Sequence, residues 1–263
     1  MPTLELETMR CEVEGALGRL RLNRPQALNA ANRQWVQDLV AATEYLATQR
    51  DARVVIVSGE GRAFCSGLDV KELAEGNLAP EWFDSWERGV TNRERLDAIT
   101  IAAIQGYSLG GGLQVVLACD LRIAATDAVL SIPAVREGVV AALGPMRLAR
   151  QIGASRAKRL CLLGHRFSPA EGAELGVVDE VVEPDALETR VCEMADELLA
   201  IPFTALRLTK RQINRAFDAD MTTLHAEMVA GQEDCLRSPE HAEVMTTYRE
   251  QQAQRRARKA GAS

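Results

Sequence analysis

The stretch at residues 101–120 limits what this chain can fold into more than any other. Residues 101–104 are apolar and rich in isoleucine, which is typical of a buried strand, and residues 113–118 continue as an apolar helix. Between them, Gly106 and three consecutive glycines, 110–112, form a turn without side chains. Since each glycine weakens a helix by roughly 1 kcal/mol relative to alanine, this placement indicates that some group approaches the backbone closely.

Two chemistries fit such a turn. The first N–H groups of a helix lack internal partners and lie at its positive end, so they can hold a negatively charged oxygen. Residues 106–110 also match G-x-S-x-G, the nucleophile elbow of α/β-hydrolases, with Ser108 as the nucleophile. A hydrolase needs an HGGG-type loop upstream, which this sequence lacks. It also leaves a second glycine-rich loop, residues 59–67, without a role, so we favour the oxyanion interpretation.

Strands and helices alternate along most of the chain, which predicts an α/β fold. Two alternating runs before residue 23 predict a β-hairpin with Gly15 between its strands. The strand–helix–strand order that follows predicts parallel pairing with both faces of the sheet covered. The expected strands are residues 4–13, 16–22, 53–58, 101–104, 121–125, 129–132 and 177–182, and the expected helices before residue 168 are 32–49, 81–98 and two within 144–164, broken near Gly153.

From Ser168 onward the sequence is acidic and helical. Ser168 is a helix N-cap followed by Pro169 at the first helical position. Four more helical segments follow Pro184, with breaks at Pro202, residues 218–220 and residues 238–239. A helical tail of this size cannot bury all its apolar residues alone, so we expect it to pack on a neighbouring subunit.

Composition excludes several classes of protein. Lys and Arg number 31 against 37 acidic residues, a net charge of −6, which argues against a nucleic-acid partner. The three histidines and six cysteines are scattered, without C-x-x-C or H-E-x-x-H, so we expect no metal site. We find neither a signal-peptide pattern nor an apolar span of about 20 residues. We therefore expect a cytoplasmic protein with reduced thiols and no membrane partner.

Four motifs, residues 22–30, 61–73, 105–120 and 163–182, together resemble the enoyl-CoA hydratase/isomerase (crotonase) family. The resemblance implies an α/β fold with a spiral core of ββα repeats. It places an acyl-CoA site in residues 1–195 and a helical trimerisation region in residues 196–263. The implied partners are an acyl-CoA substrate and further copies of the chain, as a homotrimer or a dimer of trimers. Coenzyme A is part of the substrate, so no separate cofactor is expected.

The same resemblance assigns site residues. In the family, two backbone amides hold the thioester oxygen, and here they belong to Leu68 and Gly111. The expected coenzyme A path and acyl pocket comprise Gln26, Ala27, Leu28, Leu68, Asp69, Val70, Lys71, Gly110, Gln114 and Ala134. Asp69 is expected to order its loop by accepting backbone N–H bonds, and Cys65 is expected to be a structural thiol.

The chain departs from the family at the acid–base positions. Hydratases carry two glutamates where this sequence has Gln114 and Ala134, and a third position used by some isomerases holds Ala142. None of these can transfer a proton, which is what water addition requires. The nearest carboxylate is Glu137. If it faces the pocket it is the candidate acid–base catalyst; otherwise it is exposed or paired with Arg136.

The resemblance implies an acyl-CoA enzyme of fatty acid metabolism, a lyase or isomerase that stabilises a thioester enolate. Isomerase-type or divergent chemistry fits the missing glutamates better than hydration does. The alternatives are a non-catalytic acyl-CoA binding protein and a thioester hydrolase or decarboxylase on the same scaffold.

Overall fold

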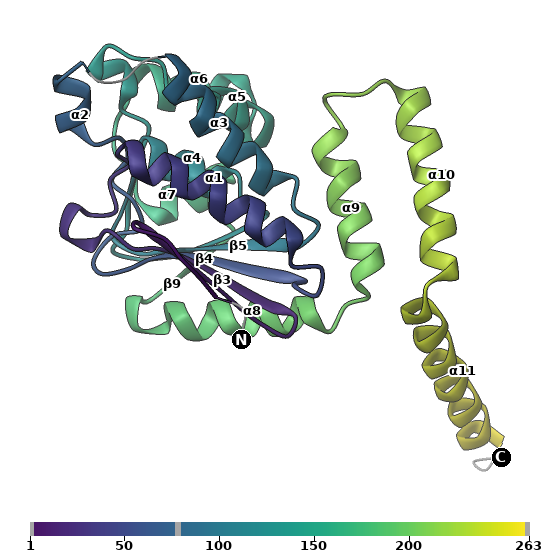
Figure 1. The fold of residues 1–263 in the computed structure, drawn as a ribbon. Coiled ribbons are helices and arrows are strands. Elements are labelled where there is room, and N and C mark those ends of the chain that lie inside the picture. Colours follow the sequence, from purple (N-terminus) through teal and green to yellow (C-terminus); the bar gives the residue numbers. More distant parts are fainter. Residues whose placement is uncertain (1–2, 77–79, 261–263) are drawn as a thin grey trace. The chain divides into compact units, whose positions relative to one another are not determined.

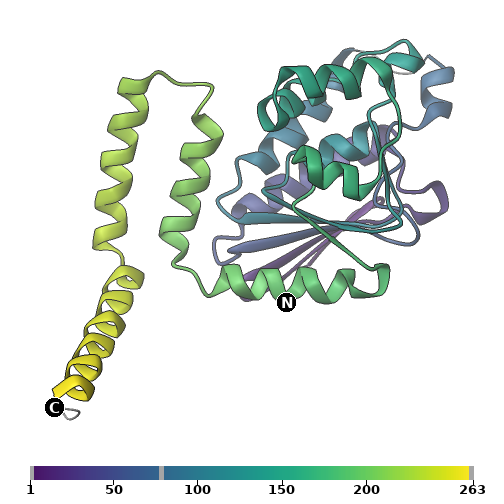
Figure 2. The same ribbon diagram turned by 180° about the vertical axis from the view of Figure 1, so that it is seen from behind.

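The computed structural model describes residues 3–76 and 80–260, and the chain divides into two compact units, residues 1–198 and 199–263. The first unit has layers: α1, α3 and α4 cover one face of a β-sheet, and α8 crosses the other (Figures 1 and 2). On that second face, Arg19 of the sheet donates to Glu188 of α8 at 3.1 Å. No helix in the described ranges has the length and apolar character to cross a membrane.

A seven-stranded sheet in the order β1-β2-β3-β4-β5-β7-β9 forms the centre of this unit. Its strands are β1 Thr3–Glu5, β2 Met9–Glu14, β3 Leu17–Leu22, β4 Val54–Gly59, β5 Ile99–Ile104, β7 Leu121–Ala125 and β9 Glu180–Val182. β2 and β3 form the predicted hairpin, with Gly15 at φ +56° in its turn. From β3 onward all pairs are parallel, with Leu17 opposite Val54 and Leu22 opposite Gly59. The predicted parallel pairing is confirmed.

A second, two-stranded sheet pairs β6 Tyr107–Leu109 with β8 Val129–Ser131. The sequence predicted a plain turn here, with a helix from residue 113, and both details are wrong. Cys65 bonds to both ends of β6, because its amide donates to the carbonyl of Tyr107 at 2.9 Å and its carbonyl accepts from Leu109 at 3.0 Å. These bonds hold residues 107–109 in an extended conformation, and α4 begins at Gly111.

Helices connect and cover the strands. The helices of the first unit are α1 Arg33–Thr48, α2 Val70–Ala74, α3 Pro80–Glu94, α4 Gly111–Leu117, α5 Gly144–Ile152, α6 Ala154–Leu163, α7 Pro169–Leu175 and α8 Leu187–Leu199, with 3-10 turns η1 Pro25–Ala27, η2 Ala134–Glu137 and η3 Pro184–Ala186. The Asn32 side chain caps α1 by accepting the Trp35 amide at 2.9 Å. Gly89 lets α3 approach α1 closely, since a Cβ there would lie 2.9 Å from Leu39.

Two predicted elements are shorter than expected. The helix expected over residues 81–98 ends at Glu94, and β5 begins at Ile99. The strand expected over residues 177–182 pairs only from Glu180. Val177 and Val178 instead donate their amides to the carbonyl of Gly172, at 2.8 and 3.2 Å, and so close the end of α7.

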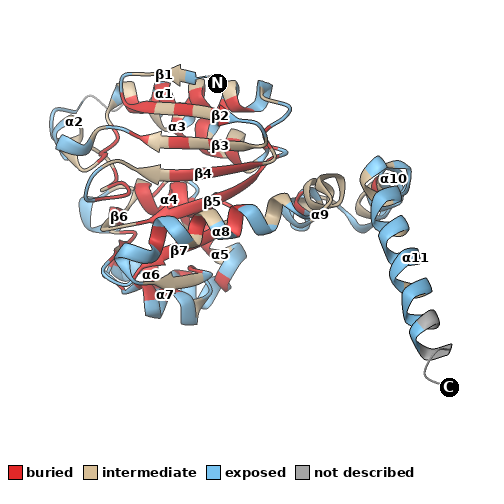
Figure 3. Cartoon of the chain, turned by 90° about the horizontal axis from the view of Figure 1, so that it is seen from below, coloured by how far each residue is buried: buried red, intermediate tan, exposed pale blue. Residues whose placement is uncertain are grey.

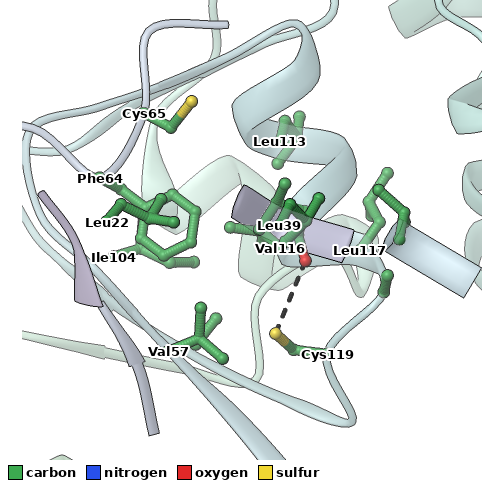
Figure 4. Close-up of a cluster of buried hydrophobic side chains, with 14 of the residues drawn as sticks. Leu22, Leu39, Val57, Phe64, Cys65, Ile104, Leu113, Val116, Leu117 and Cys119 are labelled. Atoms are coloured by element: carbon green, nitrogen blue, oxygen red, sulfur yellow. Dashed lines mark hydrogen bonds between the residues drawn. The ribbon is translucent and has the colours of Figure 1, made fainter. Parts of the chain in front are cut away.

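The apolar core lies between the sheet and the helices above it (Figure 3). All six residues of β5 are buried, as expected for a central parallel strand. Figure 4 shows Leu22, Val57 and Ile104 of the sheet facing Leu39 of α1 and Leu113 and Val116 of α4. This packing fixes α4 above the sheet.

The second unit comprises α9 Phe203–Arg215, α10 Met221–Arg237 and α11 Pro239–Ala260, with the predicted breaks between them. Glu240 accepts the amides of Phe203 and Thr204 at 3.0 and 2.9 Å and thereby joins α11 to the start of α9. Large apolar side chains are exposed along these helices, among them Ile213, Phe217, Met221 and Leu236.

Candidate functional site

A pocket of about 80 Å³ lies within the first unit, with room for a short acyl group or a few water molecules. Loop residues after β4, helix α3, the start of α4, η2 and the segment before α5 enclose it. The lining residues are Ser66, Gly67, Leu68, Val70, Trp82, Phe83, Trp86, Gly110, Gly111, Gln114, Pro133, Ala134, Glu137, Val139, Val140, Ala141 and Ala142.

The two amides expected to hold an oxygen, those of Leu68 and Gly111, belong to this pocket. The peptide groups flanking Leu68 are engaged, because the Gly67 carbonyl accepts from Ala31 at 2.7 Å and the Asp69 amide donates to Ala31 at 3.0 Å. The Leu68 amide itself has no acceptor in the described part of the chain, and neither has that of Gly111. Both N–H groups therefore remain free to bind a ligand.

The conformation and close contacts of residues 110–112 within the protein explain why all three are glycine. Gly110 has φ +52° and ψ −113°, a conformation that side chains disfavour. A Cβ on Gly111 would lie 2.6 Å from the Trp86 ring, and one on Gly112 would lie 2.1 Å from the Cys65 carbonyl oxygen. The groups that approach this backbone closely therefore include the protein's own tryptophan and loop carbonyl.

Gln114 and Ala134, the residues expected at the acid–base positions, both line the pocket. Gln114 is 4% exposed and packs beneath Gly144, where a Cβ would lie 2.6 Å from its Cγ. Its Oε1 is buried without a hydrogen-bond partner among the described residues. A buried amide oxygen without a partner costs stability, so the pocket carries a polar group that the fold does not need.

Glu137 is the one carboxylate among the described residues that line the pocket. It ends η2 and is exposed, so it lies at the rim. The alternative pairing with Arg136 is not seen, because the Arg136 Nε donates to the Leu163 carbonyl at 2.7 Å. Glu137 thus combines exposure with access to the pocket.

An aromatic wall was not predicted as part of the site. Trp82, Phe83 and Trp86 of α3 line the pocket, and Trp86 stacks between Trp82 and Trp35, with ring centroids 5.5 and 5.2 Å away. The sequence signal was three aromatic residues within five positions in a chain that is 4% aromatic. In the sequence, however, these residues simply fall within the helix expected over residues 81–98.

The residues expected along the coenzyme A path divide into two groups. Leu68, Val70 and Gly110 line the pocket, whereas Gln26, Ala27, Leu28, Asp69 and Lys71 do not. The two loops that carry this second group nevertheless adjoin, because Ser66 donates its amide to the Leu28 carbonyl at 3.0 Å. Gln26 and Lys71 are exposed.

Asp69 joins these two loops. Its carboxylate accepts from Arg24 at 2.7 Å and from the Lys71 amide at 3.1 Å, which caps α2. Burial acts to raise the pKa of Asp69, but the bonds from Arg24 and Lys71 outweigh it and hold that pKa below its ordinary value. Asp69 thus accepts a backbone N–H, as expected of a residue that orders the loop.

Neither candidate nucleophile is placed for attack. Ser108 is fully buried within β6 and does not line the pocket, whereas an elbow serine is exposed at a turn. Cys65 is also fully buried, and its thiol donates to the Asn29 carbonyl at 3.1 Å. Burial raises the pKa of Cys65 to about 12, which suppresses the reactive thiolate. Both residues are structural here.

A search of the described residues finds no group of three or more His, Cys, Asp or Glu side chains arranged to hold a metal ion. The polar groups carried by the lining residues include the Leu68 and Gly111 amides, the Ser66 hydroxyl, the Trp82 and Trp86 indole N–H groups, the Gln114 amide and the Glu137 carboxylate. They can bind an acyl oxygen and, through Glu137, accept or donate a proton.

Comparison with known proteins gives consistent matches. The model of the family described as enoyl-CoA hydratase/isomerase matches residues 12–256. A relative from Mycobacterium bovis, described as a probable enoyl-CoA hydratase, is 35% identical over 221 residues, which cover 82% of this chain and 84% of that protein.

Solved structures agree with these matches. An enoyl-CoA hydratase subunit from Geobacillus kaustophilus has a TM-score of 0.86 and 33% identity, covering 94% of this chain and 97% of that one. A putative enoyl-CoA hydratase from Thermobifida fusca, solved in complex with acetoacetyl-CoA, has a TM-score of 0.79 and 28% identity, covering 87% of this chain and 94% of that one.

Proposed function

Because this chain belongs to the enoyl-CoA hydratase/isomerase family, we propose that its pocket binds an acyl-CoA with the thioester oxygen on the amides of Leu68 and Gly111. The predicted crotonase-like core with C-terminal helices is confirmed by the same comparisons. The observation that carries the proposal is that two residues of one pocket, Leu68 and Gly111, have backbone amides without an acceptor in the part of the chain that the structure describes.

The chemistry follows from where negative charge develops. Removing a proton from the carbon beside a thioester moves charge onto the carbonyl oxygen and gives an enolate. Fixed N–H donors stabilise that charge, and the loss of one such donor costs roughly 3 kcal/mol. Since both donors are backbone groups, substitution of the Leu68 side chain acts only through the shape of the loop.

Glu137 is the group proposed to move the proton. Hydration requires one group to deprotonate water and another to protonate the α-carbon, and Gln114 and Ala134 can do neither. A single carboxylate can shift a double bond by carrying one proton between two carbons. We therefore assign isomerase-type chemistry, with Gln114 orienting the acyl group through its amide.

A non-catalytic acyl-CoA binding protein is the second candidate. The observation that favours it is that the deep positions of the pocket hold an amide and a methyl group, while the one lining carboxylate is exposed at the rim. Such a pocket retains the oxygen-binding amides without a buried acid or base. Thioester hydrolysis and decarboxylation can also use those amides without the two glutamates, but no further observation favours them.

We further propose that residues 199–263 mediate self-association into a homotrimer or a dimer of trimers. Support comes from the large apolar side chains exposed on that unit, such as Ile213 and Met221. A cytoplasmic location is supported by six cysteines that are all free thiols. We propose no cofactor other than the coenzyme A of the substrate.

The test combines calorimetric titration with acyl-CoA and assays of crotonyl-CoA hydration and 3-enoyl-CoA isomerisation. The leading proposal expects binding, isomerisation at a measurable rate and little hydration. Glu137→Gln should abolish turnover but keep binding, whereas Glu171→Gln, an exposed acid away from the pocket, should change neither. Binding without any turnover favours the second candidate, and an absence of acyl-CoA binding rejects both.

A further inference from the structure

A buried arginine joins two separate segments that line the pocket. Arg147 of α5 has a side chain only 3% exposed. Its Nε and Nη2 donate to the two carboxylate oxygens of Glu94 at 2.7 and 3.1 Å. Its Nη1 donates to Glu87 at 2.8 Å, and Nη2 also reaches the Thr91 hydroxyl at 3.2 Å. All these partners lie on α3.

The segment leading into α5 is held to the same helix. Residues 139–142, which line the pocket, end at Leu143, and the Leu143 amide donates to the second oxygen of Glu87 at 2.8 Å. Within this segment Ala142 has φ +40°, a left-handed conformation that alanine adopts only when its surroundings impose it. Glu87 thus binds both Arg147 and the end of a strained pocket wall.

Through α3, these ion pairs also reach the aromatic wall of the pocket. Trp82 and Trp86 precede Glu87 on α3 by five residues and one residue, so a shift of α3 relative to α5 moves the wall. A buried ion pair contributes little net stability compared with a well-packed apolar contact, but it fixes geometry because its hydrogen bonds are directional. The position of this ion pair matters more than its energy.

We propose that Arg147, Glu87 and Glu94 form a positioning cluster that sets the distance between the tryptophan wall on α3 and residues 139–143. The cluster holds the pocket open at one width before a ligand arrives. What occupies the pocket rests on the acyl-CoA function proposed above, but the positioning role does not. Arg147 itself is a positioning residue because it does not line the pocket.

The chain offers a matched control in Arg122. This arginine is similarly buried, with a side chain 10% exposed, and pairs with Asp179 at 3.1 Å. It joins β7 to the segment before β9, and neither partner lines the pocket. Arg122→Met therefore removes a comparable ion pair without touching the pocket walls.

Tryptophan fluorescence provides a readout that needs no ligand, because all three tryptophans of the chain belong to the stack beside the pocket. In Arg147→Met we expect acrylamide quenching to increase at least twofold and the emission to shift to the red. Arg122→Met should lower the melting temperature without either change. Should Arg147→Met fail to fold, Glu87→Gln, which keeps an oxygen for the Leu143 amide, should show a smaller increase of the same sign.

Two outcomes would overturn the positioning role. One is equal quenching in the wild type, Arg147→Met and Glu87→Gln. The other is an equal increase in quenching in Arg147→Met and Arg122→Met. Titration with acyl-CoA is the second measurement, and we expect Arg147→Met to raise Kd about tenfold while Arg122→Met leaves it unchanged. If the wild type binds no acyl-CoA, the proposed function fails, while the quenching comparison still decides the role of the cluster.

Discussion

Gln114 offers a direct test of how stability and function are balanced in the pocket. Its Oε1 is buried without a hydrogen-bond partner in residues 3–76 and 80–260, and its side chain packs under Gly144. Gln114→Met keeps the length and flexibility of the side chain and removes the unpaired amide. An unsatisfied buried polar group costs about 1–3 kcal/mol, so we expect the variant to gain about 1–2 kcal/mol, allowing for imperfect packing.

That gain corresponds to a rise in melting temperature of about 2–4 °C per kcal/mol for a domain of this size. The assay is urea unfolding followed by circular dichroism, with thermal unfolding as a second measure. Gln105→Met is the matched control, because the Gln105 amide donates to the carbonyls of Gly59 and Gly61 and its loss should destabilise the protein. If Gln114→Met destabilises the protein as much as Gln105→Met, the amide is satisfied and the argument is wrong.

Three further predictions concern stability. Arg93 is fully buried; its Nη2 donates to the Val115 carbonyl, but its Nε and Nη1 have no partner among the described residues. Arg93→Met should therefore raise the free energy of unfolding by about 1–3 kcal/mol, measured by urea unfolding; a loss would contradict this. Gly111→Ala places a methyl group 2.6 Å from the Trp86 ring, and should cost about 1–3 kcal/mol in the same assay and weaken acyl-CoA binding in titration. Burial raises the pKa of both Cys11 and Cys65 to about 12. Because only the unfolded chain then releases these protons, stability should fall above about pH 9 by up to about 1.4 kcal/mol per pH unit per thiol. Unfolding at pH 8 and pH 10 tests this, and alanine at both cysteines should remove the extra slope.

Local sequence patterns predicted most of the elements because those elements depend on local rules. Continuous apolar runs marked β4 and β5, and their order with α1 between β3 and β4 predicted parallel pairing. Ser168 and Pro169 marked the start of α7, where the Ser168 hydroxyl accepts the Glu171 amide at 3.2 Å. These signals act within a few residues, so one sequence suffices to detect them.

Features that depend on distant residues were missed. Residues 107–109 form β6 because they pair with β8, about twenty positions later, and with Cys65, more than forty positions earlier. The aromatic wall required knowing that α3 packs on α1, where Gly89 meets Leu39, and that its Trp86 ring lies over Gly111. None of these contacts can be detected in the local sequence pattern. The resemblance to the family indicated Leu68 and Gly111. The cluster around Arg147 depends on contacts between α3 and α5, which the sequence did not indicate.

The outer strands of the large sheet restrict how copies of this chain can associate. β1 and β9 are each three residues long, so little unpaired backbone is available at either edge for another sheet to extend. Growth by edge-to-edge strand addition, the usual route to fibrils, is therefore disfavoured. The proposed self-association would then use side-chain surfaces, which favours assemblies of limited size.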